Sequence, residues 1–241
     1  MRMAVISDIH GNLEALEQVL TDIEGSDIDR MVCLGDSIGY GPEPEAVVTM
    51  IHDRHIPSIL GNHELAVIDQ NLLTWFNPLA RRSLLKTIEI LSEKTINFIS
   101  KLKPFMIFDG YRFVHGYPPD SATTYLFQIA EDELRRTFKQ MKEKICFVGH
   151  THRLEIIDFN GRSIARSPLT QRVVNLNSTD QYIINIGSVG QPRDGDNHAK
   201  YIILDTEKNS IEVKFIPYDI ASVVNKIIET GLPTEHAIRL L

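Results

Sequence analysis

Five short apolar runs in this chain each end in residues that can bind a metal ion, and this repetition constrains the fold more than any other feature. The residues at these ends are Asp8, His10, Asp36, Asn62, His63, His115, His150 and His152. Each run has the length of a buried strand. In an open sheet of parallel strands, the loops after the carboxyl ends converge on one crevice. The sequence therefore predicts an α/β fold in which these residues meet at one site.

The order of elements in the first sixty residues supports a parallel arrangement. Apolar stretches predict strands at residues 3–6, 31–34 and 56–60. After the first of them, Asn12 is a predicted N-cap, apolar residues recur at helical spacing over 13–23, and Gly25 ends the helix. A second helix is predicted around residues 46–51. Strands joined by helices form βαβ units, which place the strands in parallel.

The remaining residues add helices and hairpins. Residues 65–103 predict two helices without a strand between them, arranged as a cap over the sheet. Hairpins are predicted around Asp109–Gly110, around Asn160–Gly161 and over residues 201–216, followed by a helical tail. The prediction is one domain over residues 1–241 that holds two sheets with helices outside and a cap-like insertion at 65–103.

The residue types at the strand ends indicate a metal centre with two ions. In an extended segment, residues i and i+2 point the same way, so Asp8 with His10 and His150 with His152 could each direct two ligands into the crevice. Imidazole and carboxylate without thiolate suit Mn, Fe, Zn or Ni better than Mg or Ca alone. Seven candidate ligands are too many for one ion. Two ions about 3.5–4 Å apart are the usual arrangement for in-line attack on phosphorus.

The motifs in their order resemble those of the calcineurin-like metallophosphoesterases, and most closely the small prokaryotic phosphodiesterases of that superfamily. They are Asp-x-His, Gly-Asp, Gly-Asn-His-Glu, His-Gly and Gly-His-Thr-His, between Asp8 and His152. The segment "NIGSVGQPRDGD" at 185–196 is similar to the family's last loop motif. The resemblance implies a four-layer αββα sandwich of two mixed β-sheets.

The resemblance also implies a role for each residue. One ion would be held by Asp8, His10 and His152, the other by Asn62, His115 and His150, and Asp36 would bridge them. A hydroxide between the ions would attack phosphorus in a phosphodiester or a nucleotide phosphoanhydride. His63 would stabilise the transition state or protonate the leaving oxygen, and Glu64 would orient His63 or support the ligands from behind. The implied cofactors are two divalent ions, with Mn favoured and Fe, Ni, Zn or Co as alternatives.

Three further residues are candidates for substrate binding. Arg193 could hold a substrate phosphate through paired donors, although an exposed loop arginine is an equal interpretation. Trp75 and Phe76 in the predicted cap could stack on a nucleobase. Packing of the cap against the body is the favoured interpretation of those two rings.

Composition narrows the classes of partner that this chain is expected to bind. The formal charge of −7 argues against a nucleic-acid binder with a broad basic face, and hence against a nuclease. The two cysteines, Cys33 and Cys146, lie inside apolar runs and are predicted to be buried thiols of a reducing compartment. No signal peptide or membrane-length apolar run is visible, so a cytoplasmic protein is expected. The expected partner is a small phosphorylated substrate, with nucleotides among the candidates, and a homo-oligomer stays open.

Two motifs of this chain differ from those of other phosphatases, and the differences bear on the alternative activities. Ser/Thr protein phosphatases and the symmetric dinucleoside polyphosphate hydrolases that resemble them carry an arginine after Gly-Asp and another before Gly-Asn-His. Here these segments read "GDSIGYGP" and "ILGNHE", so that phosphate clamp is missing. Protein phosphatase activity is disfavoured, and dinucleoside polyphosphate cleavage would need another arrangement. A non-catalytic scaffold of the same fold is also considered, but such relatives lose ligands that this chain keeps.

Overall fold

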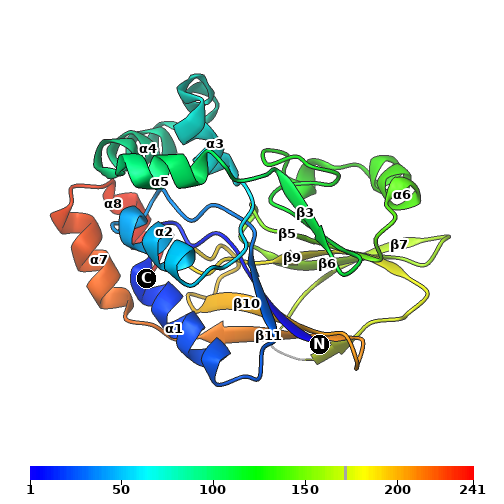
Figure 1. Cartoon of the computed structure of the whole chain (residues 1–241). Coiled ribbons are helices and arrows are strands. Elements are labelled where there is room, and N and C mark those ends of the chain that lie inside the picture. Colours follow the sequence, from blue (N-terminus) through cyan, green and yellow to red (C-terminus); the bar gives the residue numbers. More distant parts are fainter. Residues whose placement is uncertain (171–172) are drawn as a thin grey trace.

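Two mixed β-sheets face each other, and helices cover their outer sides (Figure 1). The computed structural model describes residues 1–170 and 173–241. The five-stranded sheet has the order β2 (Arg30–Cys33), β1 (Arg2–Ile6), β10 (Ala199–Asp205), β11 (Ser210–Ile216) and β8 (Val173–Asn175). Strands β1 and β2 are parallel, with Val5 opposite Val32, whereas β10 runs antiparallel to β1.

The six-stranded sheet contains two of the predicted hairpins. Its order is β3 (Phe105–Phe108), β4 (Tyr111–Val114), β5 (Ile145–Val148), β9 (Gln181–Ile186), β6 (Leu154–Phe159) and β7 (Ile164–Pro168). The β3–β4 and β6–β7 pairs are antiparallel, as predicted, and β10–β11 forms the third hairpin. Strand β5 lies between β4 and β9 and is parallel to both.

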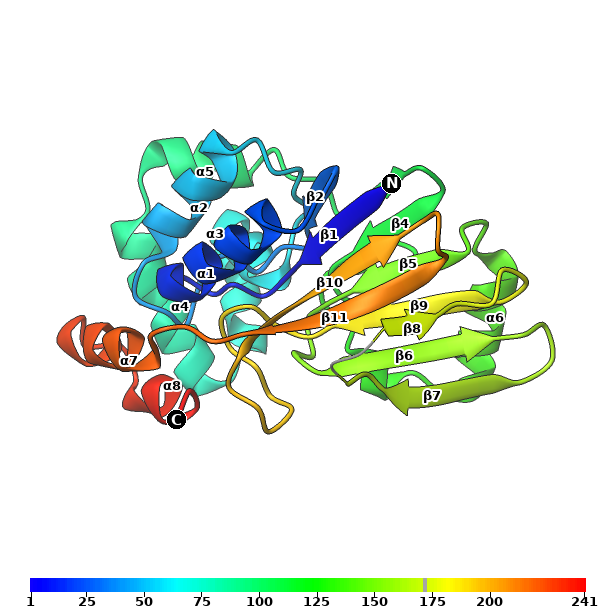
Figure 2. The same ribbon diagram turned by 90° about the horizontal axis from the view of Figure 1, so that it is seen from below.

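Apolar side chains fill the layer between the sheets and the two layers outside them. Met3, Phe113, Phe147 and Ile184 belong to the core between the sheets. Helix α1 (Leu13–Glu24) packs on the outer face of the five-stranded sheet and α6 (Glu131–Gln140) on that of the six-stranded sheet. Figure 2 shows the first sheet in front of the second, with α1 and α2 (Pro44–Asp53) beside it. The predicted four-layer αββα sandwich is confirmed.

Helix α1 begins and ends where the sequence predicts. The Asn12 side chain accepts a hydrogen bond from the Ala15 N–H at 3.1 Å, which satisfies one of the free donors of the first turn. Gly25 caps the other end. The Asn12 amide also donates to the Gly190 carbonyl at 2.9 Å, so the helix start is tied to the β9–β10 loop. This bond couples two segments that lie beside the strand ends.

The predicted strand at 56–60 is wrong in its extent. This segment joins the sheets only through single bridges, from Ser58 to Cys33 and from Ile59 to Lys103. The Cys33 N–H donates to the Pro57 carbonyl at 2.9 Å, and the Cys33 carbonyl accepts from the Ile59 N–H at 3.0 Å. Proline has no N–H, which limits a continued ladder on this segment. The segment still runs parallel to β2 and still delivers Asn62 and His63 to the same sheet edge.

Helices follow over the region predicted as a cap. They are α3 (Asn62–Ile68), the 3-10 helix η1 (Gln70–Trp75), α4 (Pro78–Ile90) and α5 (Glu93–Ile99). Helix α3 starts three residues before the predicted boundary, so Asn62 and His63 form its first turn. The tail forms α7 (Ile220–Glu229) and α8 (Thr234–Ile238), and His236 of α8 lies 2.6 Å from the Ser83 hydroxyl of α4. The helices gather at one end of the sheets (Figure 1).

Two smaller expectations concern membranes and cysteines. Within the described ranges, no helix has both the length and the hydropathy needed to cross a membrane. Cys33 and Cys146 are both buried free thiols, as predicted. Burial raises the pKa of the Cys33 thiol to about 12, so it stays protonated and unreactive near neutral pH.

Candidate active site

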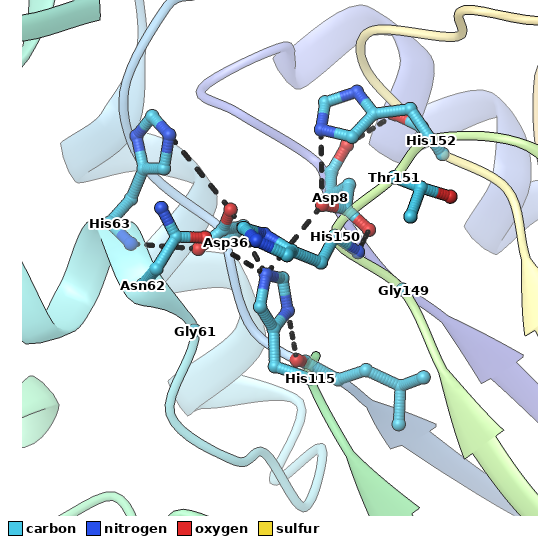
Figure 3. A network of polar contacts seen from close by, with 12 residues as sticks. Asp8, Asp36, Gly61, Asn62, His63, His115, Gly149, His150, Thr151 and His152 are labelled. Atoms are coloured by element: carbon cyan, nitrogen blue, oxygen red, sulfur yellow. Dashed lines mark hydrogen bonds and ion pairs between the residues drawn. The ribbon is translucent and has the colours of Figure 1, made fainter. Parts of the chain in front are cut away.

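All eight residues predicted at the strand ends meet in one place, and all are at least nine-tenths buried. They come from the loops after β1, β2, β4 and β5 and from the first turn of α3 (Figure 3). Three groups have ligand atoms within 4.8 Å of one another: Asp8, His10 and His152; Asp36, His115 and His150; and His10, Asp36 and His63. Asp36 belongs to the second and third of these groups and His10 to the first and third, so the group of His10, Asp36 and His63 connects the other two.

These side chains converge, but the extended backbone that the sequence predicted for the two Asp/His and His/His pairs is wrong. Asp8, His10, Asp36, His150 and His152 are not in extended backbone, because their φ angles are +54°, +52°, +50°, +65° and +59°. Left-handed backbone is costly for residues other than glycine and occurs where surrounding contacts impose it. Here Asp8 N–H donates to the Gly35 carbonyl at 3.0 Å and His10 N–H to the Asp36 carbonyl at 2.9 Å. Tight turns held by neighbouring loops therefore direct these side chains inward.

Hydrogen bonds to main-chain carbonyls fix how the imidazoles point. His10 Nδ1 lies 2.9 Å from the Ile38 carbonyl, and His115 Nδ1 lies 2.8 Å from the Leu34 carbonyl. His152 Nδ1 likewise bonds the Gln191 carbonyl. Because a carbonyl only accepts, each Nδ1 carries the proton and donates. A neutral ring then presents its Nε2 lone pair to the centre, as metal-binding histidines do.

The first cluster brings electron-rich atoms together without a hydrogen between them. His10 Nε2 and His152 Nε2 lie 3.1 Å apart, and Asp8 Oδ1 lies 3.2 Å from His152 Nε2. Asp8 Oδ1 has no hydrogen-bond partner among the described residues. Burial holds the pKa of both histidines below the usual value, so a proton is disfavoured there. A divalent cation fits this donor set, because it would replace the repulsion of three lone pairs with coordination.

The second cluster also attracts a positive charge, but there the charge can be a proton on His115. His115 Nε2 lies 3.2 Å from both Asp36 Oδ2 and Asn62 Oδ1. Burial would lower the pKa of His115, but the Asp36 carboxylate outweighs it and raises the pKa to about 9. His150 Nε2 lies 3.2 Å from the Thr123 carbonyl, which leaves its Nδ1 as the free lone pair. This cluster therefore also calls for a positive charge at its centre.

His63 and Glu64 have separate surroundings. The Glu64 carboxylate accepts from the N–H groups of Asp36, Ser37 and Gly61 at 2.8, 2.7 and 3.1 Å, so it holds the Asp36 turn from behind rather than orienting His63. His63 Nδ1 has no hydrogen-bond partner among the described residues, and its Nε2 lies 3.9 Å from Asp36 Oδ2. These distances also allow His63 to bind a cation directly.

A glycine provides the space for the His63 ring. Gly39 has φ +82°, and a Cβ there would overlap His63 Nδ1. His63 is the residue expected to act in phosphoester hydrolysis. We therefore expect Gly39→Ala to reduce kcat for that reaction by about 10²-fold, the usual effect of displacing a catalytic group by about 1 Å. Gly110→Ala is the matched control, since Gly110 has φ +79° and nothing within 4 Å of its added Cβ. Equal kcat values for the two variants would contradict this assignment, and steady-state kinetics with thermal unfolding would separate activity from stability.

The cluster opens onto a pocket of about 320 Å³ that contains residues missed in the sequence. The candidate phosphate ligand Arg193 lines it, and so do Tyr40, Thr123 and Tyr125. The Tyr40 ring lies 4.5 Å from the His10 ring and 4.6 Å from the His63 ring. The signal for Tyr40 was its place in "GDSIGYG", four residues after Asp36, whereas nothing local marks Tyr125.

A buried lysine anchors the loop that carries Arg193. Lys200, on β10, has a fully buried side chain whose Nζ lies 2.9 Å from Asp194 Oδ1 and 3.3 Å from Asp196 Oδ1. It also donates to the carbonyls of Asp196 and His198 at 2.6 and 3.2 Å. The ammonium therefore holds three residues of the β9–β10 loop beside the pocket.

We expect Lys200→Met to lower the free energy of unfolding by about 1–3 kcal/mol, the cost of leaving buried hydrogen-bonding groups unpaired. Urea denaturation checks this value. Lys208→Met is the control, because that side chain is 79% exposed and reaches a single carboxylate, at 3.6 Å. A loss no larger than that of the control would mean that the Lys200 contacts contribute nothing to stability.

Comparison with known proteins supports a common ancestry over most of the chain. Residues 1–209 match the calcineurin-like phosphoesterase superfamily domain. The crystal structure of a metallophosphoesterase from Sphaerobacter thermophilus has a TM-score of 0.86 and 32% identity, and the match covers 100% of this chain and 98% of that one. An uncharacterised protein of Methanocaldococcus jannaschii is 35% identical over 237 residues, 96% of this chain and 93% of that protein.

Two further proteins are similar at lower identity or over a shorter part of the chain. A hypothetical protein from Pyrococcus horikoshii has the same fold, with a TM-score of 0.81, 17% identity and coverage of 99% and 97%. A zinc-dependent endopolyphosphatase of Saccharomyces cerevisiae is 35% identical over 98 residues, which is 39% of this chain and 30% of that protein. With its motifs in the family's order, its two facing sheets and a family match over most of its length, the chain belongs to the calcineurin-like phosphoesterase superfamily.

Proposed function

We propose that this protein is a hydrolase of phosphodiester or nucleotide phosphoanhydride bonds that uses two divalent metal ions. The observation that carries the proposal is a pair of buried ligand clusters, Asp8/His10/His152 and Asp36/His115/His150, that are linked by the 3.8 Å approach of Asp36 Oδ2 to His10 Nε2 and open onto one pocket. Asp8, His10 and His152 would hold one ion, Asn62, His115 and His150 the other, and Asp36 would contact both. Mn²⁺ is favoured, with Fe, Ni, Zn and Co as alternatives.

When bound, two such ions would polarise the phosphoryl oxygens and lower the pKa of water toward neutrality. The chain's own residues supply the rest. The Arg193 guanidinium makes no ion pair among the described residues and lines the pocket, so it is free to bind a phosphate oxygen. His63, also in the pocket wall, is placed to donate a hydrogen bond or a proton to the leaving oxygen. The small pocket favours a small phosphorylated substrate.

The test is hydrolysis of bis-p-nitrophenyl phosphate by protein that has been treated with a chelator and then supplied with Mn²⁺. We expect activity only after the metal is added. We also expect the melting temperature to rise by roughly 5–10 °C at a metal concentration of about 100 Kd, from a stabilisation of about 2.7 kcal/mol and roughly 2–4 °C per kcal/mol. Activity that survives complete metal removal would refute the proposal.

The same experiment separates the enzyme from a scaffold. A rise in melting temperature without hydrolysis of any ester would favour a non-catalytic metal-binding member of the fold. The substrate panel should contain phosphomonoesters, cyclic nucleotides, dinucleoside polyphosphates and inorganic polyphosphate, the last because of the yeast relative. Zn²⁺ should be included for the same reason.

A further inference from the structure

The cap-side wall of the pocket carries an exposed tryptophan that packing does not explain. Trp75, at the end of η1, is 72% exposed and lines the pocket together with Asn62 and His63. It belongs to none of the hydrophobic clusters formed by the described residues. Leaving a large apolar ring in water forgoes the free energy of its burial. The sequence favoured packing of the predicted cap against the body as the role of both Trp75 and Phe76. For Trp75 this interpretation is wrong.

Its neighbour Phe76 shows the contrast. Phe76 packs with Leu72 and Ile88 in a cluster of the cap, and its ring meets the His63 ring edge-on at 5.1 Å. Packing thus accounts for Phe76 and leaves Trp75 as the ring that faces open space. Both rings line the pocket, but only the tryptophan is largely exposed.

Tyr125, from the loop after β4, is another aromatic residue that lines the same pocket. The Tyr125 ring stacks on the His150 ring at 3.9 Å with an interplanar angle of 19°. Its position after β4, between Thr123 and η2 (Leu126–Gln128), is far from η1 in the sequence. The pocket is therefore lined by residues of the ligand clusters, by Arg193, which makes no ion pair among the described residues, and by the aromatic rings of Tyr40, Trp75, Phe76 and Tyr125.

We propose that Trp75 stacks on a planar ring of the substrate, so that the substrate class is a phosphate ester bearing an aromatic or heteroaromatic group, as a nucleoside phosphate does. This inference rests on the proposed function. The phosphate would lie at the clusters and Arg193, and the ring would lie against the indole. Stacking tolerates any ring with a π-face, and the apolar side chains of Leu72, Phe76 and Ala80 line the same pocket.

Trp75 is the only tryptophan of the chain, so its fluorescence reports on this wall alone. At constant Mn²⁺, we expect adenosine 5′-monophosphate to quench the fluorescence and ribose 5-phosphate to leave it nearly unchanged. As competitive inhibitors of bis-p-nitrophenyl phosphate hydrolysis, the first should bind about 5- to 100-fold more tightly than the second, the range expected for stacking of one base. The two probes share the phosphate and the sugar, so the base is the difference.

Three variants make the test specific. In Trp75→Ala the preference for adenosine 5′-monophosphate should fall to near unity, and in Trp75→Phe it should be partly kept. Ile90→Ala is the matched control, because Ile90, at the end of the nearby helix α4 in the sequence, is 57% exposed and does not line the pocket. Its preference should equal that of the unmodified protein.

The possible failures are distinguishable. If the protein hydrolyses esters but both probes inhibit equally, or if the preference persists in Trp75→Ala, the inference is wrong and the proposed function stands. If no ester is hydrolysed with any metal, the proposed function fails. Binding of the two probes can then still be compared by fluorescence, because that measurement needs no turnover.

Discussion

Replacing Asp36 by asparagine is expected to reduce the metal-dependent hydrolysis of bis-p-nitrophenyl phosphate by at least about 10³-fold, since the loss of several kcal/mol of electrostatic stabilisation has that effect. Asp36 Oδ2 lies 3.2 Å from His115 Nε2, 3.8 Å from His10 Nε2 and 3.9 Å from His63 Nε2. It is thus the one carboxylate shared by two of the ligand clusters. Asparagine would place an NH₂ group or a neutral oxygen where the proposed pair of ions would require a bridging anion.

The same substitution should preserve the fold. Asp36 Oδ1 accepts from the His63 N–H at 2.9 Å, and an asparagine oxygen can keep this bond. The measurement is kcat/KM together with metal content by mass spectrometry, and we expect less than the metal content of the unmodified protein. Glu143→Gln is the control, because Glu143 is a buried carboxylate paired with Arg112 at 3.2 Å outside the site. An Asp36→Asn variant with activity within tenfold of the control would exclude a bridging role.

His63→Ala is expected to lower kcat by about 10²–10⁴-fold, the usual contribution of a positioned proton donor, while metal content stays the same. Burial lowers the pKa of His63 to about 4, so its ring is neutral near pH 7 in the protein alone. A neutral ring can still donate a hydrogen bond, and a bound phosphate would favour its protonated form. The rate should be measured with esters of good and of poor leaving groups.

A comparison of esters with different leaving groups tests which role His63 has. A proton donor matters most when the leaving oxygen is basic, so the loss should grow from p-nitrophenyl to alkyl esters. An equal loss for both esters would indicate stabilisation of the transition state instead. Because His63 also lies within reach of His10 and Asp36, a variant that has lost one metal ion would show that His63 is a ligand.

Much of the site was predictable because its signal is local. A short apolar run followed by Asp, Asn or His indicates a strand end and a ligand together, and this pattern recurs at Asp8, Asp36, Asn62, His115 and His150. The order of these motifs also predicted the fold, since parallel strands place such loops at one edge. The hairpins at Asp109–Gly110 and Asn160–Gly161 were equally local, because each turn depends on two residues.

Other features depend on contacts between distant segments and have no local signal. The left-handed turns at Asp8 and His10 are held by carbonyls of the next loop, 27 and 26 residues away. The position of Tyr125 against His150 and the anchoring of the β9–β10 loop by Lys200 are contacts across the fold. The segment at 56–60 pairs through single bridges and does not form the expected strand. Pro57, within this segment, has no N–H to donate to a neighbouring strand.

The sequence by itself determined the residue types of the site, the order of the strands that carry them and the family to which the chain is similar. Only the tertiary structure decided which nitrogen of each histidine faces the centre, that Glu64 holds the Asp36 turn, and that Trp75 faces the pocket while Phe76 packs in the cap. The physical reason is that hydrogen-bond partners and burial are properties of segments brought together from far apart in the chain, whereas residue type and periodicity are carried by each segment alone.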